Sequence, residues 1–150
     1  MKKLNKKLSI TCAIILIIII IVVIIREHSS QPPKLNNIAS VRVEYNQRIA
    51  KILSLDSQIE IKNVEQIDKL VDCFNVKSSY ERGCDCPSHD IIIYFISDKK
   101  DFVYNIGITG DVRIQYSEVP DKDIVGIDID DIIEILKQNP GSENLKYPID

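Results

Sequence analysis

The 150-residue chain contains no tryptophan, only five glycines and only two histidines. Several catalytic signatures are absent as well, because no phosphate-binding glycine loop, Gly-x-Ser-x-Gly elbow or His-Glu-x-x-His zinc motif occurs in it. One histidine, His28, lies near the N-terminus, which leaves His89 as the only candidate general base of the C-terminal part. The sequence therefore gives no positive support for an enzyme.

Charge is missing from one long segment near the N-terminus. Residues 8–25 include no charged residue, no proline and no glycine. As a helix this segment would be about 27 Å long, close to the thickness of the hydrocarbon core of a bilayer. A cleaved signal peptide would share the basic start, but the apolar run continues into Arg26 without the small residues of a cleavage site. We therefore expect a basic tail at 1–7 and a retained transmembrane helix at 8–25.

Positive charge is distributed unevenly around this segment. Four lysines precede it and no acidic residue does, so the positive-inside rule places the N-terminus in the cytoplasm. The expected protein is a single-pass membrane protein with a signal anchor and an extracytoplasmic C-terminal part. The residues after 25 carry 15 Lys and Arg against 22 Asp and Glu. This acidic balance, without a basic stripe, argues against nucleic acid and anionic lipid surfaces as partners.

The first half of the exposed part combines a spacer, strands and a helix. Residues 26–37 are polar and contain Pro32 and Pro33, so we interpret them as a spacer before one domain at 38–150. Asn63 with Gln66 three residues later forms a capping box that predicts a helix as far as Phe74. Alternating polar and apolar residues predict three extended segments before this helix, at 41–45, 48–55 and 59–61. The first two are expected to form a hairpin about Asn46 and Gln47.

The second half predicts a meander and a closing helix. Residues 91–96 are continuously apolar, which is typical of a central strand, and residues 102–108 and 112–116 predict two further antiparallel strands. Asp131 with Glu134 predicts the start of a final helix. The predicted fold is α+β, in the order strand, strand, helix, three-strand meander, helix, with the helices packed on one face of the sheet.

Three cysteines follow the predicted anchor, and they leave three interpretations open: unpaired thiols with no special role, a disulfide or a metal site. A disulfide from Cys73 to Cys84 or Cys86 would suit an oxidising compartment, but it leaves one thiol unpaired. Alternatively, Cys73, Cys84, Cys86 and His89 form a Cys₃His set that suits zinc, and the thiolates also suit copper(I). The Cys-x-Cys spacing is tighter than that of most zinc sites.

These patterns favour a membrane-anchored extracytoplasmic binding or interaction module, with a protein or cell-envelope partner and no cofactor. The alternative hypothesis is a metal- or thiol-handling protein that uses the cluster of Cys73, Cys84, Cys86 and His89. An enzyme ranks third, because no orienting partner for His89 is identifiable.

Overall fold

The computed structural model describes residues 14–21, 31–83, 89–109, 112–119 and 122–147. The chain divides into two compact units, Met1–Gln31 and Pro32–Asp150. In the first unit, residues 14–21 are helical, and the rest of the predicted anchor lies outside the described residues. Within the described ranges, none of the helices has both the length and the apolar character needed to cross a membrane.

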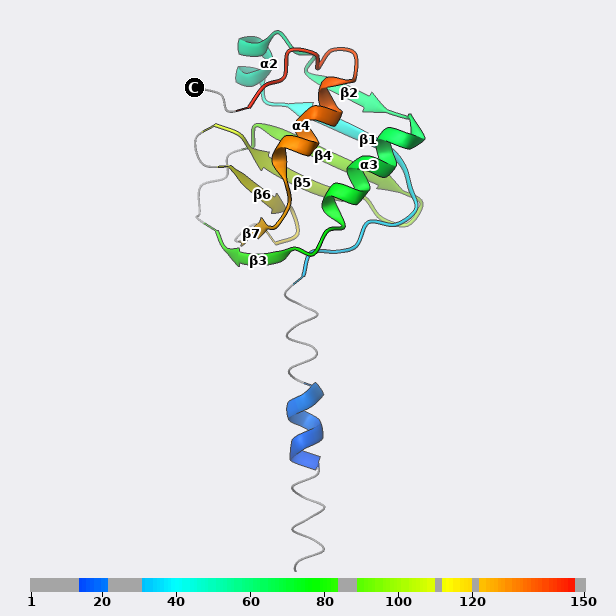
Figure 1. Cartoon of the computed structure of the whole chain (residues 1–150), viewed down its shortest axis with the longest axis vertical. Helices are drawn as coiled ribbons and strands as arrows, with labels where there is room; N and C mark the ends of the chain where they lie inside the picture. The colour runs from blue at the N-terminus through cyan, green and yellow to red at the C-terminus, as the bar shows by residue number, and fades with distance from the viewer. Residues whose placement is uncertain (1–13, 22–30, 84–88, 110–111, 120–121, 148–150) are drawn as a thin grey trace, which may run out of the picture. The chain divides into compact units, whose positions relative to one another are not determined.

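The second unit is built on a five-stranded antiparallel sheet with the strand order β2-β1-β4-β5-β6 (Figure 1). Its strands are β1 (Ile38–Tyr45), β2 (Gln58–Ile61), β4 (Ile91–Ser97), β5 (Phe102–Gly107) and β6 (Arg113–Tyr116). The central position of β4 and the meander β4-β5-β6 confirm the sequence prediction. A separate two-stranded antiparallel sheet, which the sequence analysis did not predict, pairs β3 (Ser79–Arg82) with β7 (Lys122–Val125).

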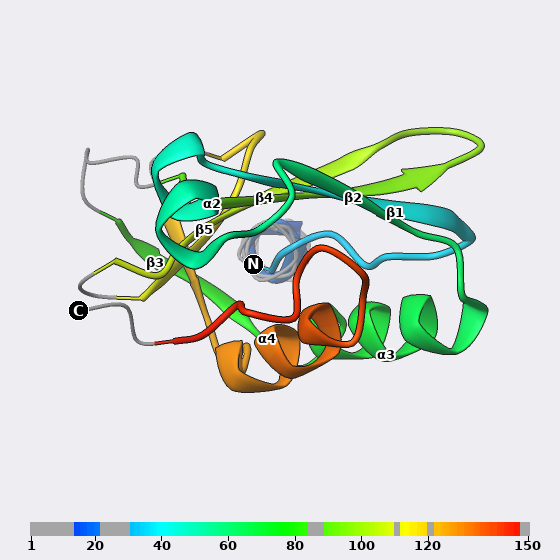
Figure 2. The same cartoon turned by 90° about the horizontal axis from the view of Figure 1, so that it is seen from above.

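Two helices, α3 (Val64–Phe74) and α4 (Ile129–Lys137), lie side by side on one side of the sheet (Figure 2). The predicted start of α3 is confirmed, because Gln66 N donates to Asn63 Oδ1 at 3.2 Å. Helix α4 begins earlier than predicted. Its N-cap is Asp128, whose Oδ1 accepts from Asp130 N at 2.9 Å, and this earlier start brings Ile129 into the core. The protein is therefore an α+β fold with few helices.

The segment after β1 is a helix, α2 (Gln47–Leu53), so the predicted strand over 48–55 and the hairpin about Asn46 and Gln47 are wrong. Asn46 caps the helix by accepting a hydrogen bond from Arg48 N at 2.9 Å. Ile49, Ala50 and Leu53 are buried together, which helical spacing permits and the alternation of a strand does not. A polar cap and one apolar stripe therefore decide the structure of this segment.

The core lies between the sheet and the helices α3 and α4. Along β4 the side chains of Ile91, Ile93 and Phe95 are fully buried, and they alternate with half-buried residues. Phe95 and Tyr104 of β5 pack with Phe74 of α3, with ring centroids 4.6 to 5.7 Å apart. The remaining residues of these strands point to the other side of the sheet.

Candidate binding surface on the open face of the sheet

The side of the sheet opposite α3 and α4 carries a group of half-buried side chains. Successive residues of a strand point to opposite sides of the sheet, so these positions alternate with the core residues. We call this group the open face, and its members are Arg42, Glu44, Ile92, Tyr94, Ile96 and Val103. The continuous apolar run of β4 therefore serves both sides, the core on one and the open face on the other.

Three side chains at the centre of the open face interact. The guanidinium carbon of Arg42 lies 4.1 Å from the centroid of the Tyr94 ring. Arg42 Nε lies 3.3 Å from Glu44 Oε1, and the Tyr94 hydroxyl donates to Glu44 Oε2 at 3.1 Å. Partial burial, followed by the contact with Glu44, raises the pKa of Tyr94, so its phenol is neutral at physiological pH. The result is a surface on which a guanidinium, an aromatic ring and a carboxylate contact one another.

The open face continues into a shallow hollow of about 430 Å³. Glu44 and Ile92 line it together with His89, and Asn46 Nδ2 donates to the His89 carbonyl at 3.3 Å. The ring atom His89 Nδ1 is buried and has no hydrogen-bond partner in the part of the chain that the structure describes. An incoming side chain that reaches this atom would remove the cost of its unpaired burial.

The predicted cysteine and histidine cluster is only partly visible. Cys73 lies on α3, which covers the side of the sheet opposite the open face, and it carries a free thiol. Cys84 and Cys86 lie outside the described residues. Within the described residues, no three His, Cys, Asp or Glu side chains are arranged to hold a metal ion. The disulfide, zinc and copper interpretations therefore stay predictions.

Burial, followed by the nearby carboxylates of Asp131 and Asp72, raises the pKa of the Cys73 thiol to about 11. A thiol binds a metal ion or attacks an electrophile as its thiolate. The described surroundings of Cys73 therefore favour the protonated, unreactive form.

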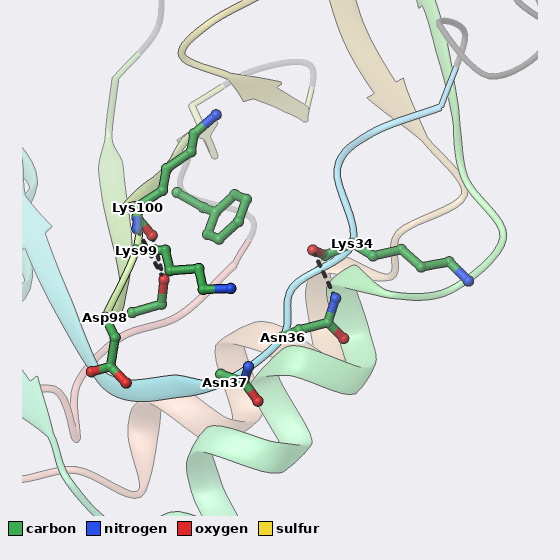
Figure 3. Close-up of a pocket in the computed structure, with 8 residues that line it drawn as sticks. Lys34, Asn36, Asn37, Asp98, Lys99 and Lys100 are labelled. Carbon is green, nitrogen blue, oxygen red and sulfur yellow. Dashed lines mark hydrogen bonds between the residues drawn. The ribbon is translucent and has the colours of Figure 1, made fainter.

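A second hollow, of about 340 Å³, lies beside the turn between β4 and β5, and Lys34, Lys99 and Lys100 contribute to its lining (Figure 3). Ser97 and Lys100 have the Ser-x-x-Lys spacing of serine-lysine catalytic pairs, which the sequence analysis missed. Ser97 Oγ donates to the Lys100 carbonyl at 2.6 Å, and Lys100 Nζ donates to Glu118 at 2.8 Å. The ammonium group of Lys34 points away from the other two lysines (Figure 3), so the three do not converge on one anion.

Comparison of the chain with protein-family models, curated proteins and solved structures finds no match. The chemistry of the open face is therefore the basis for a functional argument. It presents a guanidinium, a phenol and a carboxylate that pair with one another, surrounded by apolar side chains. Such an arrangement suits noncovalent binding.

Proposed function

We propose that the chain is a single-pass membrane protein whose extracytoplasmic domain binds a protein partner through the open face. The observation that carries this proposal is the stacking of Arg42 on Tyr94 among half-buried apolar side chains. Arginine and tyrosine are enriched among the residues that dominate binding energy at protein interfaces. Ile96 and Val103 would exclude water around this central pair.

The apolar N-terminal segment supports the membrane part of the proposal. Each residue at 14–21 is aliphatic and exposes between 48% and 59% of its surface. Exposure of eight such side chains to water is unfavourable, and burial of each in lipid contributes roughly 1.5 to 3 kcal/mol. The lysines before this segment support a cytoplasmic N-terminus.

The anchor and its orientation are tested on the full chain expressed in a bacterial host. We expect the full chain to stay in the membrane after alkaline carbonate extraction. External protease should remove a C-terminal tag from spheroplasts without permeabilisation. A full chain extracted by carbonate would contradict the anchor, and a tag protected until the membrane is permeabilised would contradict the orientation.

The binding role is tested by crosslinking the full chain in its own cell envelope. Substitution of Tyr94 with alanine, and separately of Arg42 with alanine, should reduce the yield of crosslinked partners by at least about 10-fold, as expected for central interface residues. The matched control is Ile52→Ala, because Ile52 is an apolar residue on α2 that exposes 55% of its surface. Unchanged crosslinking in both open-face variants, or an equal loss in the control, would contradict the proposal.

A further inference from the structure

The pairing of β1 with β4 arranges the open face in two adjacent rows that run across the strands. Arg42 is paired with Tyr94, and Tyr94 is paired with Val103 of β5. In the next row, Glu44 is paired with Ile92, and Ile92 with Asn105. On β1, one row therefore carries a cation and the other an anion.

This arrangement is complementary to itself. Consider two copies of the sheet that face each other and are related by a two-fold axis in the plane between them. If this axis is perpendicular to the strands and passes between the two rows, each row of one copy lies opposite the other row of the second copy. This symmetry brings Arg42 of one copy opposite Glu44 of the second copy, and Tyr94 opposite Ile92. At the outer strand it brings Glu60 opposite Gln58, because these residues are paired with Arg42 and Glu44. None of these pairs places like charges together.

We propose that the open face is an interface between two copies of this chain, with two reciprocal contacts between Arg42 and Glu44 at its centre. The inference rests on the proposed function, because it names the partner that the open face binds. Two antiparallel sheets that pack face to face in this way form a sandwich, a common arrangement of sheets.

The charged pair within one copy leaves room for a partner. The side chains of Arg42 and Glu44 expose 37% and 35% of their surfaces. Arg42 Nε is buried, lies 3.3 Å from Glu44 Oε1 and has no hydrogen-bond partner of good geometry among the described residues, so a second copy would meet the exposed part of this side chain and not Nε. A carboxylate from a second copy would supply a hydrogen-bond acceptor to the guanidinium and strengthen the ion pair.

The dimensions of the open face set the expected strength of the dimer. Four strands about 4.8 Å apart and on average about six residues long cover roughly 400 Å² on each copy. Stable interfaces bury about 800 Å² on each partner. We therefore expect a weak dimer, which the confinement of both copies to one membrane would favour.

The test exchanges the charges in the full chain. Donor- and acceptor-labelled copies are reconstituted in phosphatidylcholine vesicles, and energy transfer is measured against protein density. Wild-type chains should show transfer that unlabelled chains compete away. R42E and E44R should each lower the association constant by at least about 10-fold, because each sets like charges opposite one another.

An equimolar mixture of R42E and E44R should restore association, because both contacts then join opposite charges. The matched control exchanges an exposed ion pair of α3, on the other side of the sheet, as E65K and K69E. These variants should associate as the wild type does. Recovery on mixing also shows that the single variants are folded.

Absence of competable energy transfer in the wild type would overturn the proposed dimer. Failure of the mixture to recover, with both variants folded by circular dichroism, would overturn the reciprocal pairing. Crosslinking in the cell envelope could instead identify a different protein as the partner of the open face, while the vesicles show no energy transfer. In that case the proposed binding function stands and the proposed self-association is rejected.

Discussion

The hydroxyl oxygen of Tyr45 lies 2.7 Å from Oγ of Ser142, although 97 residues separate them in the sequence. Ser142 is fully buried, and Tyr45 exposes only 4% of its surface. The contact joins the segment after α4 to the last residue of β1. This residue directly follows Glu44 of the open face in the sequence. Nearby, Asp56 N donates to the Gly141 carbonyl at 2.8 Å, which holds the same segment from a second direction.

Substitution of Tyr45 with phenylalanine should lower the free energy of unfolding by about 1 to 2 kcal/mol. The ring stays in place, but the hydrogen bond is lost and the Ser142 hydroxyl is left buried without this partner. Urea unfolding of residues 31–150, followed by circular dichroism, measures the change.

The double substitution of Tyr45 with phenylalanine and Ser142 with alanine is the control for this prediction. Because each single change removes the same hydrogen bond, the double change should cost less than the sum of the two. Strictly additive costs would show that the two hydroxyls do not interact.

The same tyrosine predicts a loss of stability in alkali. Burial raises the pKa of Tyr45 to about 12, although the hydrogen bond with Ser142 lowers it, whereas the ordinary value is 10. The neutral phenol is therefore favoured in the folded state. Its contribution is complete below pH 10 and is lost as the pH rises through about 12, a loss of about 2 to 3 kcal/mol.

This alkaline effect is measured as the difference in urea midpoint between pH 8 and pH 11.5. The variant Tyr45→Phe should lose less stability over this interval than the wild type, because it has no phenol to ionise at this position. Burial also raises the pKa of Tyr104, so part of the pH dependence should remain. Equal pH dependence in wild type and variant would contradict the role of Tyr45.

Asp90 should be a second determinant of stability. Its Oδ2 accepts hydrogen bonds from Ile108 N at 2.8 Å, Thr109 N at 2.9 Å and Thr109 Oγ1 at 2.7 Å. The substitution Asp90→Ala leaves these donors without that acceptor, so we expect a loss of about 3 kcal/mol in the free energy of unfolding.

The control for Asp90 is Asp98→Ala, because Asp98 is an exposed carboxylate in the turn after β4. We expect the control to change stability by less than about 0.5 kcal/mol. Urea unfolding under identical conditions compares the two variants. Similar costs for Asp90 and Asp98 would show that the three hydrogen bonds contribute little.

Local patterns predict those parts of the fold whose determinants lie close together in the sequence. The capping box at Asn63 and the apolar run at 91–96 identify α3 and β4 correctly. The prediction of an extended segment over 48–55 is wrong, because Ile49, Ala50 and Leu53 lie at helical spacing and Asn46 caps the helix, and the prediction used neither signal. The sheet of β3 and β7 depends on pairing between distant segments, which composition does not encode.

The candidate site is less predictable for the same reason. The continuous apolar run of β4 predicts burial, but it does not say which alternate residues face α3 and which form the open face. The stacking of Arg42 on Tyr94 depends on the register between β1 and β4, and no local signal in the sequence fixes that register. The hollow beside His89 likewise requires Glu44 and Ile92 to come together from two strands.

The last prediction concerns the thiol of Cys73. A pKa raised to about 11 from the ordinary value of 9 lowers the thiolate fraction by about 100-fold at pH 8. Iodoacetamide should therefore modify Cys73 about 100-fold more slowly in the native protein than in urea, as measured by mass spectrometry of the tryptic peptide at 70–77.

The substitution Asp131→Asn should speed the native reaction, because the carboxylate of Asp131 helps to raise the pKa of this thiol. Equal rates for the native and unfolded protein would contradict the protected thiol. If Cys73 resists iodoacetamide in urea until a reductant is added, it forms a disulfide with Cys84, Cys86 or a second chain. If a chelator restores the reaction instead, the thiol is a metal ligand, and the cysteine and histidine cluster becomes the functional centre.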